Sequence, residues 1–429
     1  MGTRKAIGLW SAISIGIGAM IGAGIFSILG VATGIAGHAM YISFIIAGLI
    51  ALLSTYSFAK LGTRFPSAGG PVEFLIKGLG DNIISGGFNI LLWFGYIFAL
   101  ALYARAFAGY AMTFLPVNSP EIYLNIIATA IILIFTGINF IGTKAVGKSE
   151  IIIVSIKIAI LILFVIAGFF FIKPENLSLG ELPHISNVLF GAGIVFLAYQ
   201  GFSLITNTAE DMENPKKTLP KALYSSVIIV MIIYVLVAIT VLGNLPSQQI
   251  IDAKDYALAA AAKPFLGTIG FSLIAIAALF STASGINATL YGGANVSYMI
   301  AKDGELPKVF ERKIWKNSTE GLLITVALVL LFVNIFQLGS IAMLGSASLL
   351  IIYVAVNIGH LKILKETKAN LIIIILSIIT SIIFLGILIY YEIYHSPITI
   401  LALLIVLLSS FIIEWLYRNY TTRKLKTRK

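Results

Sequence analysis

Four glycines interrupt the first long apolar segment of the chain, within residues 14–27, Ser-Ile-Gly-Ile-Gly-Ala-Met-Ile-Gly-Ala-Gly-Ile-Phe-Ser. Each glycine inside a helix costs ~1 kcal/mol relative to alanine, so this composition disfavours an ordinary continuous helix. A helix break here would leave free amides on one side and free carbonyls on the other, and these groups bind a carboxylate and an ammonium. The alternative is that the glycines let another helix pack closely. This stretch alone leaves both interpretations open.

The composition places the chain in a membrane, where unwound backbone survives only if protein buries it or water reaches it. Of the 429 residues, 59% are hydrophobic and only 11% are charged, against roughly 25% charged in soluble domains. The sequence therefore predicts an all-α polytopic membrane protein. It contains no cysteine and only four scattered histidines, so we predict no disulfide, no metal site and no cofactor.

Apolar windows of roughly 20 residues between charged or Pro/Gly-rich breaks predict twelve transmembrane helices. The predicted spans cover approximately residues 8–32, 39–63, 84–115, 122–143, 150–173, 187–209, 222–243, 266–300, 321–337, 339–361, 370–391 and 396–417. Together they form one transmembrane domain, residues 1–429.

The basic residues predict the orientation of these spans. Most of the 29 lysines and arginines fall in alternate connections, such as residues 60–77 and 302–316, and in the tail at 418–429. Basic loops stay on the cytoplasmic side of a membrane. We therefore expect a protein of the plasma membrane with both termini in the cytoplasm. The net charge of +11 thus reflects topology and predicts no nucleic-acid partner. The tail is either solvated or in contact with anionic membrane lipid.

The ionisable residues argue against an enzyme. The acidic residues fall in loops or at span ends, and neither a pair of carboxylates nor a Ser/His/Asp set is present. Two basic residues remain inside predicted spans, and such residues mark functional sites by default. Lys157 lies ~10 Å into span five. Burial there favours the neutral amine, so it could exchange a proton or, alternatively, snorkel to the interface. Arg105 could guard an outer vestibule or reach the external interface.

Span six repeats the pattern of span one. Gly191 and Gly193 precede an aromatic-rich run at 196–202. Spans one and six are five apart, as in an inverted repeat of five plus five helices with a broken helix opening each half. The predicted halves are residues 8–173 and 187–361, followed by two additional helices at 370–417.

Several motifs, in order, resemble the amino acid–polyamine–organocation (APC) superfamily of transporters over essentially the whole chain. They lie at residues 21–26, 59–71, 196–202, 209–217 and 301–307, together with Asn287. The similarity is greatest to an archaeal proton-coupled member, which has a lysine in span five where this chain has Lys157. The resemblance implies a LeuT-like fold of twelve helices.

The resemblance also implies the site residues. Around the break in span one, the substrate-binding residues are Met20, Ile21, Gly22, Ala23 and Gly24, with the amides of Ala23 and Gly24 facing the substrate carboxylate. In span six, the carbonyls of Leu197, Ala198 and Gln200 would face the substrate ammonium. Lys157 would occupy the sodium site of related transporters, facing Gly18 and Ser281, with Ser284 nearby. Phe196, Tyr199 and Phe202 are candidate gate residues or, alternatively, packing residues.

The expected function is proton-coupled symport of neutral amino acids by alternating access. No acidic residue lies inside the membrane to bind a cationic substrate, and an ammonium at the sodium site removes any sodium requirement. Gln200 and Ser203 depart from the residues usual in the family, so side-chain specificity is left open. A sodium-independent amino acid exchanger is the alternative, and a non-transporting amino acid sensor or partner subunit is a third hypothesis.

Overall fold

The computed structural model describes residues 7–420 apart from residues 23, 68, 117, 142–145, 178–182, 305 and 316–317. In this part of the chain the fold is helical, with one short antiparallel strand pair. The elements are α1 (Leu9–Ile21), α2 (Gly24–Ala36), η1 (Gly37–Ala39), α3 (Met40–Arg64), α4 (Pro71–Leu79), α5 (Ile83–Met112), α6 (Ile122–Ile141), α7 (Val146–Phe169), η2 (Pro174–Leu177), α8 (Ile185–Val195), η3 (Phe196–Asp211), α9 (Pro215–Asn244), α10 (Ser247–Ala253), η4 (Lys254–Tyr256), α11 (Ala257–Asp303), η5 (Lys308–Glu311), β1 (Lys313–Trp315), β2 (Ser318–Thr319), α12 (Glu320–Ile335), α13 (Leu338–Lys362), α14 (Leu364–Thr367), α15 (Leu371–His395) and α16 (Pro397–Tyr420).

The helices match a polytopic membrane protein. Nine helical stretches among the described residues are long and apolar enough to cross a bilayer, and the first of them, residues 9–64, covers two of the predicted spans. Two shorter apolar helices, residues 153–169 and 320–335, coincide with the predicted fifth and ninth spans. The all-helical class is confirmed, whereas the division into twelve spans and the five-plus-five repeat stay predictions.

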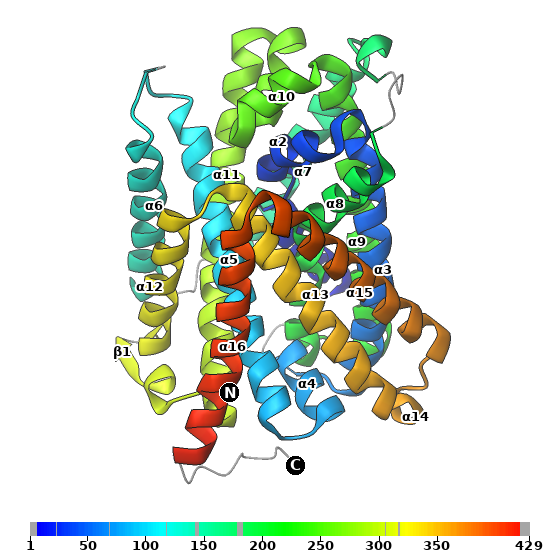
Figure 1. The fold of residues 1–429 in the computed structure, drawn as a ribbon, viewed down its shortest axis with the longest axis vertical. Helices are drawn as coiled ribbons and strands as arrows, with labels where there is room; N and C mark the ends of the chain where they lie inside the picture. The colour runs from blue at the N-terminus through cyan, green and yellow to red at the C-terminus, as the bar shows by residue number, and fades with distance from the viewer. Residues whose placement is uncertain are drawn as a thin grey trace.

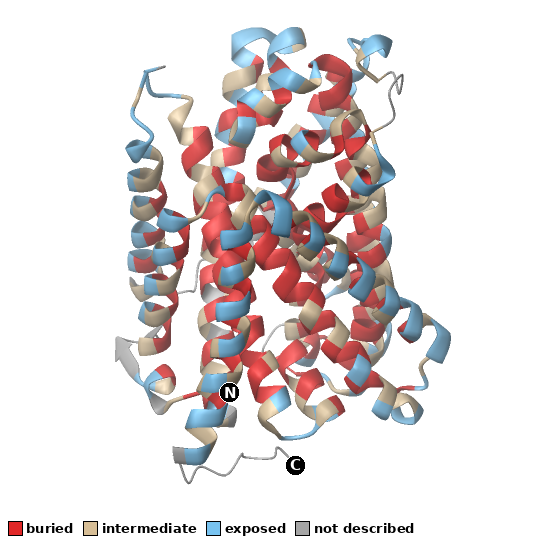
Figure 2. Ribbon diagram, in the orientation of Figure 1, coloured by how far each residue is buried: buried red, intermediate tan, exposed pale blue. Residues whose placement is uncertain are grey.

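Inner and outer helices differ in burial. The most apolar window of α13 is 83% buried, whereas that of α15 is only 28% buried. Figure 2 shows the same contrast, with buried residues gathered along the central helices and exposed ones on the periphery. The outer helices, including α6, α15 and α16, therefore present apolar side chains to the surrounding lipid.

The connections are arranged at opposite ends of the molecule. In Figure 1, α4, β1 and the last turns of α16 lie at the lower end, whereas α10 lies at the upper end. The first three belong to segments that the charge pattern assigns to the cytoplasm, and α10 belongs to a segment that it assigns to the outside. The arrangement is consistent with that assignment.

The first predicted helix break lies inside the glycine-rich stretch. Helix α1 ends at Ile21 and α2 begins at Gly24. The glycines also permit close packing, because a Cβ on Gly22 would lie 3.4 Å from the Cα of Gly285 in α11. A Cβ on Gly16 would lie only 2.4 Å from the Ile205 side chain. Both sequence interpretations therefore describe part of this stretch.

The second predicted break has a different form. Helix α8 ends at Val195, and the chain continues as the 3-10 helix η3 over 16 residues. The chain thus narrows from α to 3-10 winding at Phe196 without an extended interruption. A 3-10 helix keeps hydrogen bonds within the segment, which satisfies the backbone in an apolar interior where extended residues would need other partners. Long 3-10 runs are uncommon and often mark functional hinges.

Candidate functional site

The last turn of α1 is held by tyrosine hydroxyls from two other helices. The hydroxyl of Tyr234, in α9, donates a hydrogen bond to the carbonyl oxygen of Met20 at 2.6 Å and lies 3.3 Å from the carbonyl oxygen of Ala198 in η3. The hydroxyl of Tyr103, in α5, donates to the carbonyl oxygen of Ala19 at 3.2 Å. These carbonyls lie in the last turn of α1, where carbonyl groups lack partners within the helix. In a protein interior they accept hydrogen bonds from side chains such as these hydroxyls.

Two glycines let the interrupted helix approach η3. A Cβ on Gly201 would lie 2.5 Å from the backbone nitrogen of Met20, and a Cβ on Gly24 would lie 2.7 Å from the Cβ of Ala198. Both distances are too short for any side chain, so only glycine fits at these positions. The structure thus brings the residues predicted from span one and span six into direct contact.

A small cavity lies beside this contact. It has a volume of about 20 Å³ and is lined by Leu92, Gly95, Tyr96, Tyr103, Gln200, Gly201, Ser203, Leu204, Thr289 and Leu349. This volume holds roughly one water molecule, which is too small for an amino acid. The protein is therefore closed around this position in the structure, with α5, η3 and α11 as its walls.

The polar groups that α5 and α11 contribute to this cavity have little signal in the sequence. The side chains of Gln200 and Thr289 lie beside the Tyr103 hydroxyl, and Tyr96 lies beside Asn207. The only signal in the sequence is a hydroxyl within an apolar span, and that signal is also typical of residues that bond to their own helix. Their position is a property of the tertiary packing.

Lys157 is buried at the meeting point of three helices. Its side chain is 3% exposed, so it lies inside the protein and does not extend to the surface. Its Nζ lies 3.5 Å from the carbonyl oxygen of Ser281 in α11. The Ser281 hydroxyl in turn lies 3.2 Å from the carbonyl oxygen of Ile21 and 3.1 Å from that of Gly22. Lys157 of α7 is thereby connected through Ser281 to the end of α1.

The remaining predicted proton-coupling residues lie on the same two helices as these contacts. Gly18 is buried in α1, and Ser284 is partly buried in α11, one turn after Ser281. The carbonyl oxygen of Gly18 lies 3.3 Å from the position of a Cβ on Gly22. Ala23, which the resemblance places at the substrate carboxylate, lies outside the described residues.

The predicted backbone groups of span six already have partners within the protein. The carbonyl oxygen of Ala198 lies 3.3 Å from the Tyr234 hydroxyl. The carbonyl oxygen of Gln200 accepts the Ser203 hydroxyl at 2.9 Å. In this closed structure, protein hydroxyls therefore occupy positions that the resemblance assigns to a substrate.

The three aromatic residues proposed as a gate are buried and packed. The Tyr199 hydroxyl donates to the carbonyl oxygen of Phe44 in α3 at 2.9 Å. The rings of Phe196 and Phe202 lie 5.7 and 5.6 Å from the ring of Tyr353 in α13. Their contacts are those of a packed aromatic cluster, which also joins η3 to α3 and α13.

Arg105 joins helices of the outer half of the protein. Its Nη1 lies 2.7 Å from Oδ1 of Asn125 in α6 and 3.0 Å from the carbonyl oxygen of Val333 in α12. Both atoms belong to other predicted spans. The guanidinium thus binds polar groups within the helix bundle.

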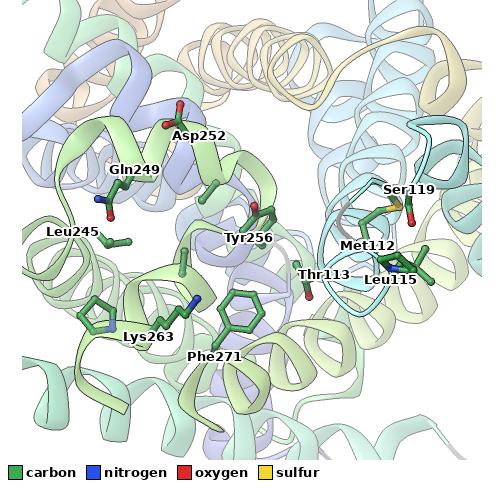
Figure 3. A pocket seen from close by; sticks show the side chains of 14 residues that line it. Met112, Thr113, Leu115, Ser119, Leu245, Gln249, Asp252, Tyr256, Lys263 and Phe271 are labelled. Atoms are coloured by element: carbon green, nitrogen blue, oxygen red, sulfur yellow. The ribbon is translucent and has the colours of Figure 1, made fainter. Parts of the chain in front are cut away.

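A larger cavity lies at the end of the molecule that carries α10. It has a volume of about 780 Å³ and is lined by residues of the α5–α6 connection, α10, η4 and α11. Figure 3 shows Gln249, Asp252, Tyr256 and Lys263 on one side and Met112, Thr113, Leu115 and Ser119 on the other. The residues at the α1 break do not line this cavity.

The apolar helices, the interrupted helix at their centre and the closed polar cavity beside it define a polytopic membrane transport protein. A family model described as amino acid permease matches residues 7–413, which is nearly the whole chain. The protein therefore belongs to the amino acid permease family, whose members are transporters and not enzymes.

Three relatives extend the comparison. An uncharacterized protein of Methanocaldococcus jannaschii is 46% identical over 424 residues, covering 98% of this chain and 97% of the relative. The inner membrane transport protein YbaT of Escherichia coli is 36% identical over 369 residues, covering 86% of each chain. A methylthioribose transporter of Bacillus subtilis is 28% identical over 381 residues, covering 83% of this chain and 81% of the relative.

Proposed function

We propose that this protein is a proton-coupled symporter of neutral amino acids that works by alternating access in the plasma membrane, with both termini in the cytoplasm. The observation that carries the proposal is the connection from Lys157 through Ser281 to the carbonyls of Ile21 and Gly22. It links a buried ionisable group to the interrupted helix by two successive contacts.

The proton acts through the charge on Lys157. In the protonated state the ammonium is attracted to the Ser281 carbonyl, which holds α7 and α11 together beside the end of α1. Loss of the proton weakens that hydrogen bond because a neutral donor binds a carbonyl less strongly than a charged one. The three helices can then separate on the cytoplasmic side, and this movement opens the site inward.

The substrate binds at the helix break. The amide of Gly24 begins α2, and a helix N-terminus favours an anionic group such as the α-carboxylate. The carbonyls of Met20 and Ala198, which now share the Tyr234 hydroxyl, face the position that an α-ammonium would occupy. On binding, the ammonium replaces the longer contact of the Tyr234 hydroxyl with Ala198, and the hydroxyl stays on the Met20 carbonyl.

The neutral class of amino acid follows from the residues beside the cavity. Its described lining contains tyrosines, Gln200, Ser203 and Thr289 but no charged side chain. A cationic or anionic side chain would be buried there without an opposite charge, at a high cost. One relative is named as a methylthioribose transporter. Methylthioribose is therefore a useful test compound, because it lacks both the ammonium and the carboxylate of an amino acid and should not compete with alanine.

The test is uptake of radiolabelled alanine into proteoliposomes that contain no internal amino acid, at external pH 5 and pH 7.5, in sodium or choline buffer. The proposal predicts faster uptake at pH 5, equal rates with sodium and choline, and no competition by methylthioribose. Uptake that requires amino acid inside the vesicles would instead show exchange and would contradict symport.

A further inference from the structure

A second feature of Lys157 concerns the membrane-facing side of the protein. An apolar groove with a volume of about 830 Å³ lies between α7 and α11 and contains Lys157 in its lining. The other lining residues are Ile153, Ile156, Ile160, Thr268, Ile269, Ser272, Leu273, Ile276, Ala277 and Phe280. Apart from Lys157, none of them is charged.

The groove opens to the outside of the helix bundle. Ile269 is 82% exposed and Phe280 is 69% exposed, whereas Ala277 is buried. Both helices are apolar along this stretch, so the opening faces the hydrocarbon of the bilayer. Water is a poor occupant because a stable buried water needs two to four polar partners, and the apolar lining offers only the Thr268 and Ser272 hydroxyls besides Lys157.

The length of the groove matches one leaflet. Along α11 the lining runs from Thr268 to Phe280, a rise of ~18 Å at the helical spacing of about 1.5 Å per residue. One leaflet of the hydrocarbon core is about half of ~30 Å. The groove is therefore long enough for most of a phospholipid acyl chain lying parallel to the helices.

We propose that this groove binds one acyl chain of a membrane phospholipid, which packs against the side chain of Lys157. The Nζ of Lys157 is directed to the Ser281 carbonyl, so the methylene groups are the part available to the chain. A bound chain closes the groove to water and leaves Lys157 accessible to protons only from the interior of the protein. The binding site itself does not depend on the proposed transport reaction.

Photochemical labelling tests the proposal without a transport assay. The full-length protein is reconstituted in phosphatidylcholine that carries a diazirine in one acyl chain, irradiated, and mapped by mass spectrometry. We expect labelling per residue along 268–280 to exceed that at Leu163 and Ile166 of α7 by at least about five-fold. These two side chains are exposed but lie outside the groove lining. Equal labelling at both places would overturn the proposal.

Filling the groove provides a matched comparison. Ala277→Phe occupies the space of the acyl chain and should lower labelling along 268–280 to the level at Leu163 and Ile166, whereas Leu163→Phe on the open face should leave it unchanged. An unchanged excess of labelling along 268–280 in Ala277→Phe would contradict a bound chain.

Single cysteine substitutions distinguish lipid from water in the groove. The chain has no native cysteine, so Ser272→Cys and Asn118→Cys each introduce a single thiol. A water-soluble maleimide should label Asn118→Cys, in an exposed connection, at least ten-fold faster than Ser272→Cys. Equal rates would show a hydrated groove and would overturn the proposal.

Discussion

The hydroxyl of Tyr234 lies 2.6 Å from the carbonyl oxygen of Met20, in the last turn of α1, and also 3.3 Å from that of Ala198 in η3. One side chain of α9 thus contacts both helices that the sequence predicts to be interrupted. Because the phenol is fully buried, its hydrogen bond exists in an interior where an unpaired carbonyl is costly. Tyr234 is therefore a structural link between the two halves of the proposed substrate site.

Replacement of this hydroxyl should weaken the site. Tyr234→Phe leaves the Met20 carbonyl without its donor, at a cost of about 1–3 kcal/mol, and should lower alanine uptake about ten-fold. Tyr56→Phe is the matched control, because Tyr56 accepts a hydrogen bond from the backbone of Asn370, away from the helix breaks. Uptake and melting temperature should be measured for both variants. Equal uptake by the two variants would show that the Tyr234 hydroxyl has no special role.

The Ser281 hydroxyl should matter for coupling. Ser281→Ala removes the contacts with the carbonyls of Ile21 and Gly22, and a hydrogen bond of this kind contributes about 1 kcal/mol. We expect the stimulation of uptake by low external pH to fall by half or more. Thr282→Val, whose hydroxyl bonds within α11, should keep the full pH response. A full pH response in Ser281→Ala would argue against a role for this serine in coupling.

Close packing at Gly201 should be intolerant of a methyl group. A Cβ there would lie 2.5 Å from the Met20 nitrogen, and overpacking of this kind costs about 1–3 kcal/mol. Gly201→Ala should therefore lower the melting temperature and abolish uptake. At Gly137 nothing lies within 4 Å of the added atom, so Gly137→Ala should leave both unchanged or raise stability slightly. The melting temperatures of the two variants in the same detergent provide the comparison.

The contact between Arg105 and its two partners should contribute to stability more than to coupling. Arg105→Gln removes hydrogen bonds to Asn125 and to the Val333 carbonyl, and we expect a lower melting temperature with an unchanged ratio of uptake at pH 5 and pH 7.5. A changed pH ratio in a variant with normal stability would instead place Arg105 in the coupling reaction.

The sequence contained the signals for the broad architecture and for the first break. Charge distribution and apolar windows predict membrane helices. The glycines of residues 14–27 predict a helix end in that stretch, and α1 ends there, at Ile21. The local pattern could not predict that span six continues as a 3-10 helix, because 3-10 runs of this length are uncommon and depend on how the segment packs. The structure shows a change of winding at Phe196, and a broken helix in span six stays a prediction.

The site shows the same division between local and long-range information. Lys157 is conspicuous in sequence because a charge inside an apolar segment is rare. Tyr234 is not conspicuous, because a tyrosine in a membrane helix is ordinary, and its partner Met20 lies 214 residues away. Contacts of that separation depend on how the helices pack, and a single sequence contains no local trace of them.

The most direct test of proton coupling is the proton movement that accompanies alanine. Proteoliposomes with an entrapped pH-sensitive dye and clamped membrane potential receive alanine outside, and internal acidification is recorded. The account predicts alanine-dependent acidification for the unmodified protein and for Lys173→Ala, an exposed control, but none for Lys157→Ala. Undiminished acidification in Lys157→Ala would contradict the central role of Lys157.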